Sequence, residues 1–275
     1  MSAIAERRYT VVIAALLIVV MCICAFAVEM VFFPIWPEES GDFTGEKGDF
    51  TIDASHTDEG YFMAMYEETS GDLKMQVVKD GEAYTYDLNN EGEYECFPLQ
   101  MGNGRYTCTV YKRVKSNKYT ALARIEMEVN MANEHFPYLS PSQYVYYEPE
   151  FDAVEASMLL CEDLETDKEK INAIVNYMVK NFSYDYVRAS LNPGFYLGDA
   201  AGCFEERKGL CQDLSVVLAC MLRVQGIPTQ LVIGYADRYY HAWNKILIDD
   251  EYQLLDITAE ITGVSASVYT EERHY

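Results

Sequence analysis

The spacing of apolar residues changes from strand-like to helix-like near residue 150, and this change constrains the fold of the 275-residue chain most strongly. Before it, six short segments alternate apolar with polar residues or are rich in Tyr, Val and Thr, and turn residues separate them. Short strands at this spacing predict a small all-β sandwich over residues 37–131. The segments are 61–66, 73–78, 83–88, 94–100, 105–114 and 119–129.

The turn expected between 94–100 and 105–114 decides how two cysteines are placed. Asn103-Gly104 favours a two-residue hairpin turn. In that register Cys96 and Cys108 point to opposite faces of the hairpin and cannot form a disulfide, because successive side chains of a strand alternate. A three-residue loop centred on Gly102 would instead place the two cysteines opposite each other. The first register predicts two free thiols.

Residues 150–275 predict an α+β domain, joined to the sandwich by a proline-bearing connector at 132–149. One helix is expected from the apolar stripe Phe151, Val154, Met158, Leu159 and Leu164. A second begins at the capping box Thr166-x-x-Glu169 and ends near Asn181. The remaining expected elements are a helix at about 210–224, stopped by Gly226 and Pro228, and strands at 229–235, 240–248 and 252–258.

The N-terminal residues 1–36 predict a membrane segment. Arg7 and Arg8 precede Val11–Val28, an 18-residue run without a charged side chain, which is long enough to cross a bilayer. An uncleaved anchor is favoured, and a signal peptide cleaved after Ala27 is the alternative, because Ala25-Phe26-Ala27 fits the small-x-small cleavage pattern. In both cases the rest of the chain, beginning with the acidic linker 37–47, lies outside the cytoplasm, either tethered to the cell membrane or secreted.

The composition excludes several classes of function. The chain carries 44 acidic and 21 basic side chains, for a net charge of −23, and therefore repels the phosphate backbone of a nucleic acid. It contains no C-x-x-C, which argues against zinc ribbons and thioredoxin-like redox chemistry. Asp249-Asp250-Glu251 is interpreted as a solvated hairpin tip rather than a Ca²⁺ site. No cofactor or metal is expected.

Cys211 is the candidate nucleophile. It lies in Gly209-Leu210-Cys211-Gln212-Asp213, where a loop leads into an apolar helix. The first backbone N–H groups of a helix are unpaired and its dipole stabilises an anion, so a cysteine there has a lowered pKa and is a better nucleophile. The same N–H groups supply half of an oxyanion hole. Cys161 and Cys220 are expected to be buried and inert.

His241 and Asp256 complete a candidate triad. A two-residue turn at Asp249-Asp250, or a four-residue turn over 248–251, places Asp256 opposite Trp243 and diagonal to His241, on one face of the sheet. An aspartate within an apolar strand needs a partner, and His241 is the obvious one. A three-residue turn would place Asp256 on the other face. The alternative interpretation is a core histidine and an aspartate that caps a helix.

The order of these motifs resembles the transglutaminase-like superfamily, and most closely its bacterial exported members. The resemblance covers roughly 165–260. The motifs are Phe182-Ser183-Tyr184-Asp185, Gly-x-Cys-x-Asp-x-Ser at 209–215, Gly226-Ile227-Pro228, Val232-x-Gly234-Tyr235, His241-Ala242-Trp243 and Leu255-Asp256-x-Thr258. The resemblance implies a papain-like α+β fold for 150–275, with Cys211, His241 and Asp256 as the catalytic triad.

The resemblance also implies the reaction, which proceeds through an acyl-enzyme thioester on a peptide or glutamine-type amide. Hydrolysis is slightly favoured over amine cross-linking, with a protein or peptide substrate and a cell-wall peptide as one option. The tryptophan that holds the oxyanion in eukaryotic enzymes is missing, since only Trp36 and Trp243 occur. Tyr184 and Gln212 are candidates for the second donor. A catalytically silent module that binds peptides or cell wall is the alternative function.

Overall fold

The computed structural model describes residues 34–67, 69–191, 194 and 196–275. The N-terminal segment predicted to enter the membrane lies almost wholly outside this range, so the anchor and the signal peptide both stay predictions. Among the described residues, no helix is long and apolar enough to cross a membrane. Phe33–Tyr275 form one compact unit, within which the predicted boundaries at 131 and 150 also stay predictions.

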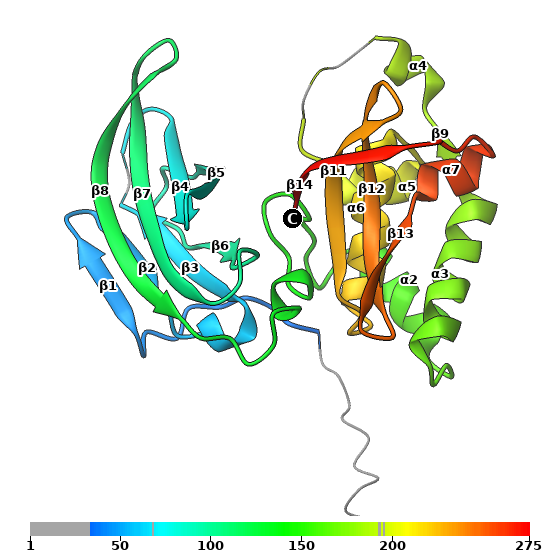
Figure 1. Ribbon diagram of the computed structural model, residues 1–275, viewed down its shortest axis with the longest axis horizontal. Helices are drawn as coiled ribbons and strands as arrows, with labels where there is room; N and C mark the ends of the chain where they lie inside the picture. The colour runs from blue at the N-terminus through cyan, green and yellow to red at the C-terminus, as the bar shows by residue number, and fades with distance from the viewer. Residues whose placement is uncertain (1–33, 68, 192–193, 195) are drawn as a thin grey trace, which may run out of the picture. The chain divides into compact units, whose positions relative to one another are not determined.

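Residues 44–129 form two four-stranded antiparallel sheets (Figure 1). The first has the order β1-β2-β3-β6, with β1 Thr44–Lys47, β2 Phe50–Asp53, β3 Tyr61–Tyr66 and β6 Glu95–Pro98. The second has the order β5-β4-β7-β8, with β4 Leu73–Lys79, β5 Glu82–Leu88, β7 Gly104–Lys115 and β8 Lys118–Val129. All six predicted strands are present. The expectation of a plain linker at 37–47 was wrong, because β1 lies there and pairs with β2.

The buried faces of the two sheets share a core of aromatic and aliphatic side chains. Tyr86 of β5 packs edge-on against Phe97 of β6, with 5.3 Å between ring centroids. Alternate residues of β4 are buried, as the period-2 pattern predicts for a strand with one solvent face. Turns at Asp80-Gly81 and at Ser116-Asn117 join β4 to β5 and β7 to β8.

The predicted hairpin at Asn103-Gly104 was wrong. The chain crosses there from one sheet to the other, since β6 pairs with β3 and β7 pairs with β4 and β8. The Asn103 side chain explains the difference, because its Oδ1 accepts from the N–H of Met131 at 2.6 Å and so ties the loop to the end of β8. Cys96 and Cys108 are free thiols, as expected, but because they lie in different sheets.

The remainder combines helices with a four-stranded antiparallel sheet of order β13-β12-β11-β14 (Figure 1). The strands are β11 Thr229–Ala236, β12 Tyr239–Ile248, β13 Glu251–Leu255 and β14 Tyr269–His274. The helices are α2 Asp152–Cys161, α3 Asp167–Asn181, α4 Tyr186–Ser190, α5 Ala200–Glu206, α6 Cys211–Arg223 and α7 Ile257–Thr262. Two short strands, β9 Ser183–Tyr184 and β10 Lys208–Gly209, pair in parallel, and 3₁₀ turns lie at Thr57–Glu59 and Phe136–Tyr138.

Helices α2 and α3 test the apolar stripes predicted from the sequence. Thr166 caps α3 in the predicted capping box with Glu169, and α3 ends at Asn181 as expected. The stripe predicted for α2 was wrong in part, because Met158 and Leu159 are exposed. The buried face of α2 includes Ser157 instead, whose hydroxyl donates to the carbonyl of Met221 in α6 at 2.6 Å.

Helix α6 is the centre of this half of the molecule. Every residue from Gln212 to Arg223 is buried, and α6 contacts α2, α3, α5, α7, β11 and β12. Because the first turn of such a helix is held on all sides, the residue at its N-terminus has a fixed position. That residue is Cys211.

Arg223, the last residue of α6, is fully buried, and within the described part of the chain its guanidinium hydrogen-bonds to backbone oxygens alone. Its guanidinium donates to Thr229 at 2.7 and 2.9 Å, to Ser140 at 2.6 Å and to Tyr275 at 3.0 Å. Burial lowers the pKa of this group, and the contacts compensate for its lost hydration. Arg223 thus ties the end of α6 to the connector, to β11 and to the residue that follows β14.

Replacing Arg223 with Met is expected to lower the free energy of unfolding by about 3 kcal/mol, because three buried carbonyls lose their donor. Chemical denaturation of the full chain measures the loss. Arg124→Met is the matched control, since Arg124 is exposed on β8 and pairs with exposed Glu126; its cost should stay within about 0.5 kcal/mol. Equal losses in the two variants would contradict the structural role of Arg223.

Candidate active site

Cys211 is the first residue of α6, as predicted. It directly follows β10 and Leu210, and β10 pairs with β9 so that Gly209 lies beside Tyr184. A Cβ at Gly209 would come within 2.7 Å of the Cys203 sulfur and 2.8 Å of the Asp213 Cβ, so only glycine fits at this approach. The close packing fixes the path of the chain immediately before the cysteine.

The buried carboxylate of Asp213 organises the same helix end. It accepts from the N–H of Leu210 at 2.9 Å, from Arg188 at 2.8 Å, from the Tyr196 hydroxyl at 3.2 Å and from the N–H of Asp199 at 3.2 Å. Leu210 directly precedes α6, and the other three partners come from α4 and from the chain between α4 and α5. Asp213 therefore holds the segment after β9 against the first turn of α6, two residues beyond Cys211.

His241 lies on β12 in the register expected from the sequence. Asn244 pairs with Leu255 and Ile248 pairs with Glu251, which leaves Asp249 and Asp250 as a two-residue turn. Both turn residues have positive φ, 51° and 64°, as a type I′ turn requires.

The predicted strand 252–258 was too long. Strand β13 ends at Leu255, and Asp256 is the N-cap of α7. Asp256 lies beside His241, but from a helix cap rather than from within a strand. Asp256 caps the start of α7, and Gly263, at φ 71°, caps its end. Aspartate and glycine are common at these two positions, so the sequence does contain signals for the ends of α7.

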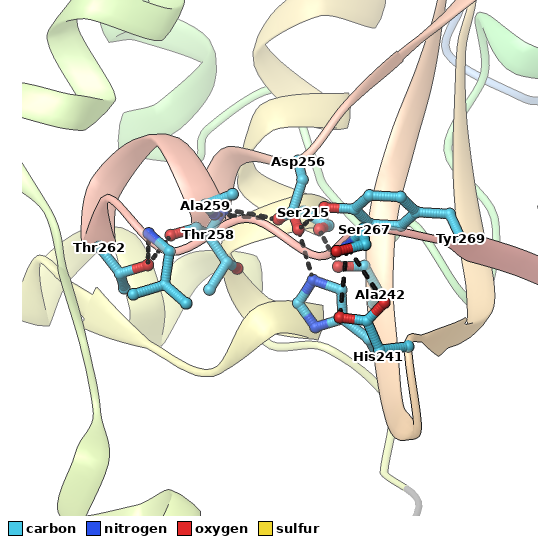
Figure 2. Close-up of polar contacts among 11 residues, drawn as sticks. Ser215, His241, Ala242, Asp256, Thr258, Ala259, Thr262, Ser267 and Tyr269 are labelled. Atoms are coloured by element: carbon cyan, nitrogen blue, oxygen red, sulfur yellow. Dashed lines mark hydrogen bonds and ion pairs between the residues drawn. The ribbon is translucent and has the colours of Figure 1, made fainter.

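The Asp256 carboxylate accepts four hydrogen bonds, and Figure 2 shows the groups converging on it. Its Oδ2 lies 2.8 Å from Nε2 of His241 and 2.8 Å from the Tyr269 hydroxyl. Its Oδ1 accepts from the N–H groups of Thr258 at 3.0 Å and Ala259 at 3.1 Å. Burial alone would raise the pKa of Asp256, but these contacts, led by His241, outweigh it and lower the pKa.

The His241 ring binds Asp256 and lines the same cavity as Cys211. Burial alone would lower the pKa of His241, but the interactions with Asp256 and with nearby Cys211 outweigh it and raise the pKa to about 9. Because Nε2 faces Asp256, Nδ1 is the ring nitrogen left for the Cys211 sulfur. The structure therefore brings the three residues singled out in the sequence to one place, and their catalytic role stays a prediction.

Cys211 and His241 line a cavity of about 520 Å³, called here the active-site cleft. Tyr184, Tyr196, Tyr239 and Tyr240 form much of its walls. Among the described cysteines only Cys211 lines this cleft. Burial raises the pKa of the other described thiols, which include Cys161 and Cys220, as expected for inert cysteines.

Both candidates for the second oxyanion donor, Tyr184 and Gln212, line the active-site cleft. Burial, followed by the nearby Cys211, raises the pKa of Tyr184 to about 12, so its hydroxyl keeps its proton. Within the described part of the chain, the buried Nε2 of Gln212 has no hydrogen-bond partner. The two candidates remain open.

Tyr269 is the site residue that the sequence did not predict. It lies at the start of β14, whose polar sequence gives no strand signal. Strand β14 approaches β11 closely, and a Cβ at Gly234 would overlap the carbonyl oxygen of Thr270. The absence of that Cβ lets β14 carry Tyr269 to Asp256, where its ring also packs edge-on against Trp243 at 5.2 Å.

No group of three or more His, Cys, Asp and Glu side chains in the described residues is arranged to hold a metal ion. The acidic tip at Asp249 and Asp250 is the exposed turn between β12 and β13.

A model of the transglutaminase-like superfamily matches residues 159–257, a range that contains Cys211, His241 and Asp256. The match confirms the resemblance predicted for roughly 165–260. A search of curated proteins found no match.

Several solved structures are also similar. A TGase crystal structure is 22% identical, with 42% of this chain and 32% of that chain covered and a TM-score of 0.35. A candidate cysteine protease from Cytophaga hutchinsonii is 17% identical, with coverages of 78% and 91% and a TM-score of 0.40. A candidate protease from Parabacteroides distasonis is 13% identical, with coverages of 71% and 37% and a TM-score of 0.36. This chain spans about a third of the length of the TGase. The identification of the domain rests on the family match.

The raised pKa of His241 predicts that its ring loses its proton at a higher pH than an ordinary histidine does. The ring should titrate with a midpoint of about 9 in the full chain, followed by NMR of the histidine ring protons and assigned with His241→Gln. Asp256→Asn and Cys211→Ala should each lower the midpoint, because each removes a contact that favours the protonated ring. A wild-type midpoint near the ordinary 6.5 would contradict the described contacts.

The same pair gives stability a defined pH dependence. Since the folded pKa of His241 is raised, its contribution is fully present below about pH 6.5 and is lost as the pH rises through about 9. The lowered pKa of Asp256 gives a contribution present above about 3.8 and lost as the pH falls through its folded value. The stability difference between wild type and Asp256→Asn should therefore be largest at about pH 4–6.5. Asparagine retains a capping oxygen, so the charge is what changes.

Proposed function

We propose that the transglutaminase-like domain of this chain, residues 159–257, is a thiol enzyme that transfers acyl groups from peptide or glutamine-type amides. Cys211 is the nucleophile, His241 the proton shuttle and Asp256 the group that orients the imidazole. The observation that supports the proposal is the 2.8 Å contact between Nε2 of His241 and Asp256, with Cys211 lining the same cleft as that ring.

In the proposed mechanism the two ring nitrogens of His241 have different partners. Nε2–H donates to Asp256, so Nδ1 is free to take the proton of the Cys211 thiol. The raised pKa of His241 favours this transfer. The thiolate attacks the amide carbon, and the unpaired N–H groups at the start of α6 stabilise the oxyanion.

Collapse of the tetrahedral intermediate breaks the C–N bond. Nδ1 gives its proton to the leaving amine or ammonia, and a thioester remains on Cys211. Water or an amine then attacks the thioester, His241 takes a proton from it and returns that proton to the cysteine. Water gives peptidase or amidase activity, and an amine gives a cross-link. We favour water, because many members of the superfamily are hydrolases.

The first test uses thiol labelling. Iodoacetamide should alkylate Cys211 far faster than the other described cysteines, because it alone among them lines the cleft. Peptide mass mapping of the full chain locates the label. His241→Gln should slow labelling of Cys211 by at least about tenfold, whereas Cys161→Ala should leave it unchanged. Labelling of Cys211 at the rate of the buried cysteines would favour the silent binding module instead.

Kinetics with an amide substrate provide the second prediction. Cys211→Ala and His241→Ala should each remove nearly all activity, and the double variant should be little worse than either, because the two groups act in one step. Asp256→Ala should cost less, since nucleophile and base both remain. Additive losses in the double variant would contradict a shared step.

We also propose that the domain acts outside the cytoplasm, held by the N-terminal segment. The proposal rests on Arg7 and Arg8 before the apolar run Val11–Val28. A protease added to intact cells should digest the chain after about residue 40, and a cytoplasmic protein serves as the protected control. Full protection of the chain would contradict this location.

A further inference from the structure

The active-site cleft is uncharged in a strongly acidic protein. The chain has 44 acidic and 21 basic side chains, yet among the described residues that line the cleft none is Asp, Glu, Lys or Arg. The lining consists of Cys211 and His241 together with aromatic, aliphatic and neutral polar residues. A substrate group in the cleft therefore meets no fixed charge other than that of the reacting pair.

Two basic side chains near the cleft are paired with carboxylates. Arg188 of α4 is bound to Asp213 at 2.8 Å and stacks over the Tyr196 ring at 4.6 Å. Lys208 of β10 lies 3.1 Å from Asp185.

Arg238 follows Asp237 in the chain and donates at 2.8 Å to the hydroxyl of Tyr239, a residue that lines the cleft. Glu272 of β14 is not among the residues that line the cleft. Burial, followed by the negative charge of Glu272, raises the pKa of Tyr240. The charges around the cleft are of both signs, so none of them provides a dominant partner for a charged substrate side chain.

Exposed aromatic and aliphatic side chains border the cleft on both walls. Tyr239 and Tyr240 on β12 are 63% and 53% exposed, and Tyr235 packs edge-on against Tyr240 at 5.6 Å. Tyr184, which also lines the cleft, lies edge-on to Tyr186 at 5.1 Å. The next residues of α4 extend this surface, since Val187 is 71% exposed. Apolar side chains gathered around a cavity mark a surface that binds a ligand.

We infer that the cleft selects acyl donors whose side chain next to the reacting carbonyl is uncharged and apolar or aromatic. The inference rests on the proposed function. An apolar side chain there gains contact with the tyrosines. A charged side chain would lose water without finding an opposite charge. The substrate class is accordingly a peptide with a neutral, apolar residue on the acyl side of the bond that breaks.

The net charge of the protein predicts the opposite order of reactivity, so the two explanations can be distinguished by experiment. A protein of charge −23 attracts cations and repels anions, so long-range electrostatics alone would favour a lysine-bearing donor. If the lining of the cleft decides, a neutral apolar donor reacts faster than a cationic one. Raising the ionic strength screens the long-range contribution and leaves the contacts within the cleft.

The experiment compares four peptidyl chloromethyl ketones of equal length that carry Leu, Tyr, Lys or Glu next to the reactive group. The inactivation rate of the full chain is measured for each, and the Cys211 adduct is confirmed by mass mapping. The Leu and Tyr probes should react at least about tenfold faster than the Lys and Glu probes at 0.15 M salt. The inference would be overturned if the Lys probe inactivated the protein fastest, or if the four inactivation rates lay within about threefold of one another.

Iodoacetamide separates this result from a failure of the proposed function, because it is too small to sense the walls of the cleft. If iodoacetamide labels Cys211 and the four probes do not discriminate, the selectivity is wrong and the thiol chemistry stands. If iodoacetamide does not label Cys211, the proposed function fails and the selectivity fails with it.

A charge placed in the cleft should change the preference. Tyr240→Glu should raise the rate of the Lys probe relative to the Leu probe by about tenfold, and Tyr239→Glu is the second variant in case the first does not fold. Val114→Glu adds the same charge at a 62% exposed position of β7 and should leave the ratio within about twofold. An unchanged ratio in a folded cleft variant would overturn the inference.

Discussion

The Asp256 carboxylate is the contact on which the geometry of the site depends. One oxygen begins α7 by accepting the N–H groups of Thr258 and Ala259, and the other binds His241 of β12 and Tyr269 of β14. A single buried group thus fixes a helix, the orientation of an imidazole and the path of a neighbouring strand. Because all four donors favour the ionised carboxylate, the protein retains a buried negative charge beside the His241 ring.

Asp213 has the corresponding role at the other end of the site. It accepts from the N–H of Leu210 at the start of α6 and holds Arg188 and Tyr196, which places the wall of the cleft near Cys211. The core of the domain supports both carboxylates, since α6 is buried over its whole length after Cys211 and Arg223 fixes its far end. The rigid position of Cys211 is therefore a consequence of packing and of two buried carboxylates together.

Local signals explain what could be predicted from the sequence. The turn at Asp249-Asp250 determines the register of β12 and β13, and alternation with turn residues located six strands of the two β-sheets. Long-range contacts explain the errors. Asn103 binds Met131 and so takes β7 into another sheet than β6, and Ser157 is buried on α2 because it reaches Met221. Tyr269 reaches Asp256 only through the path of β14, which no local pattern specifies.

The formation of a thioester on Cys211 tests the central claim most directly. The full chain is mixed with N-acetyl-leucine p-nitrophenyl ester, quenched in acid and analysed by intact mass and peptide mapping, with His241→Gln as the control. The account predicts one acetyl-leucyl group on Cys211 that hydroxylamine removes, and a much slower acylation in the control. Acylation confined to lysines, or equal acylation of Cys211 in both proteins, would contradict it.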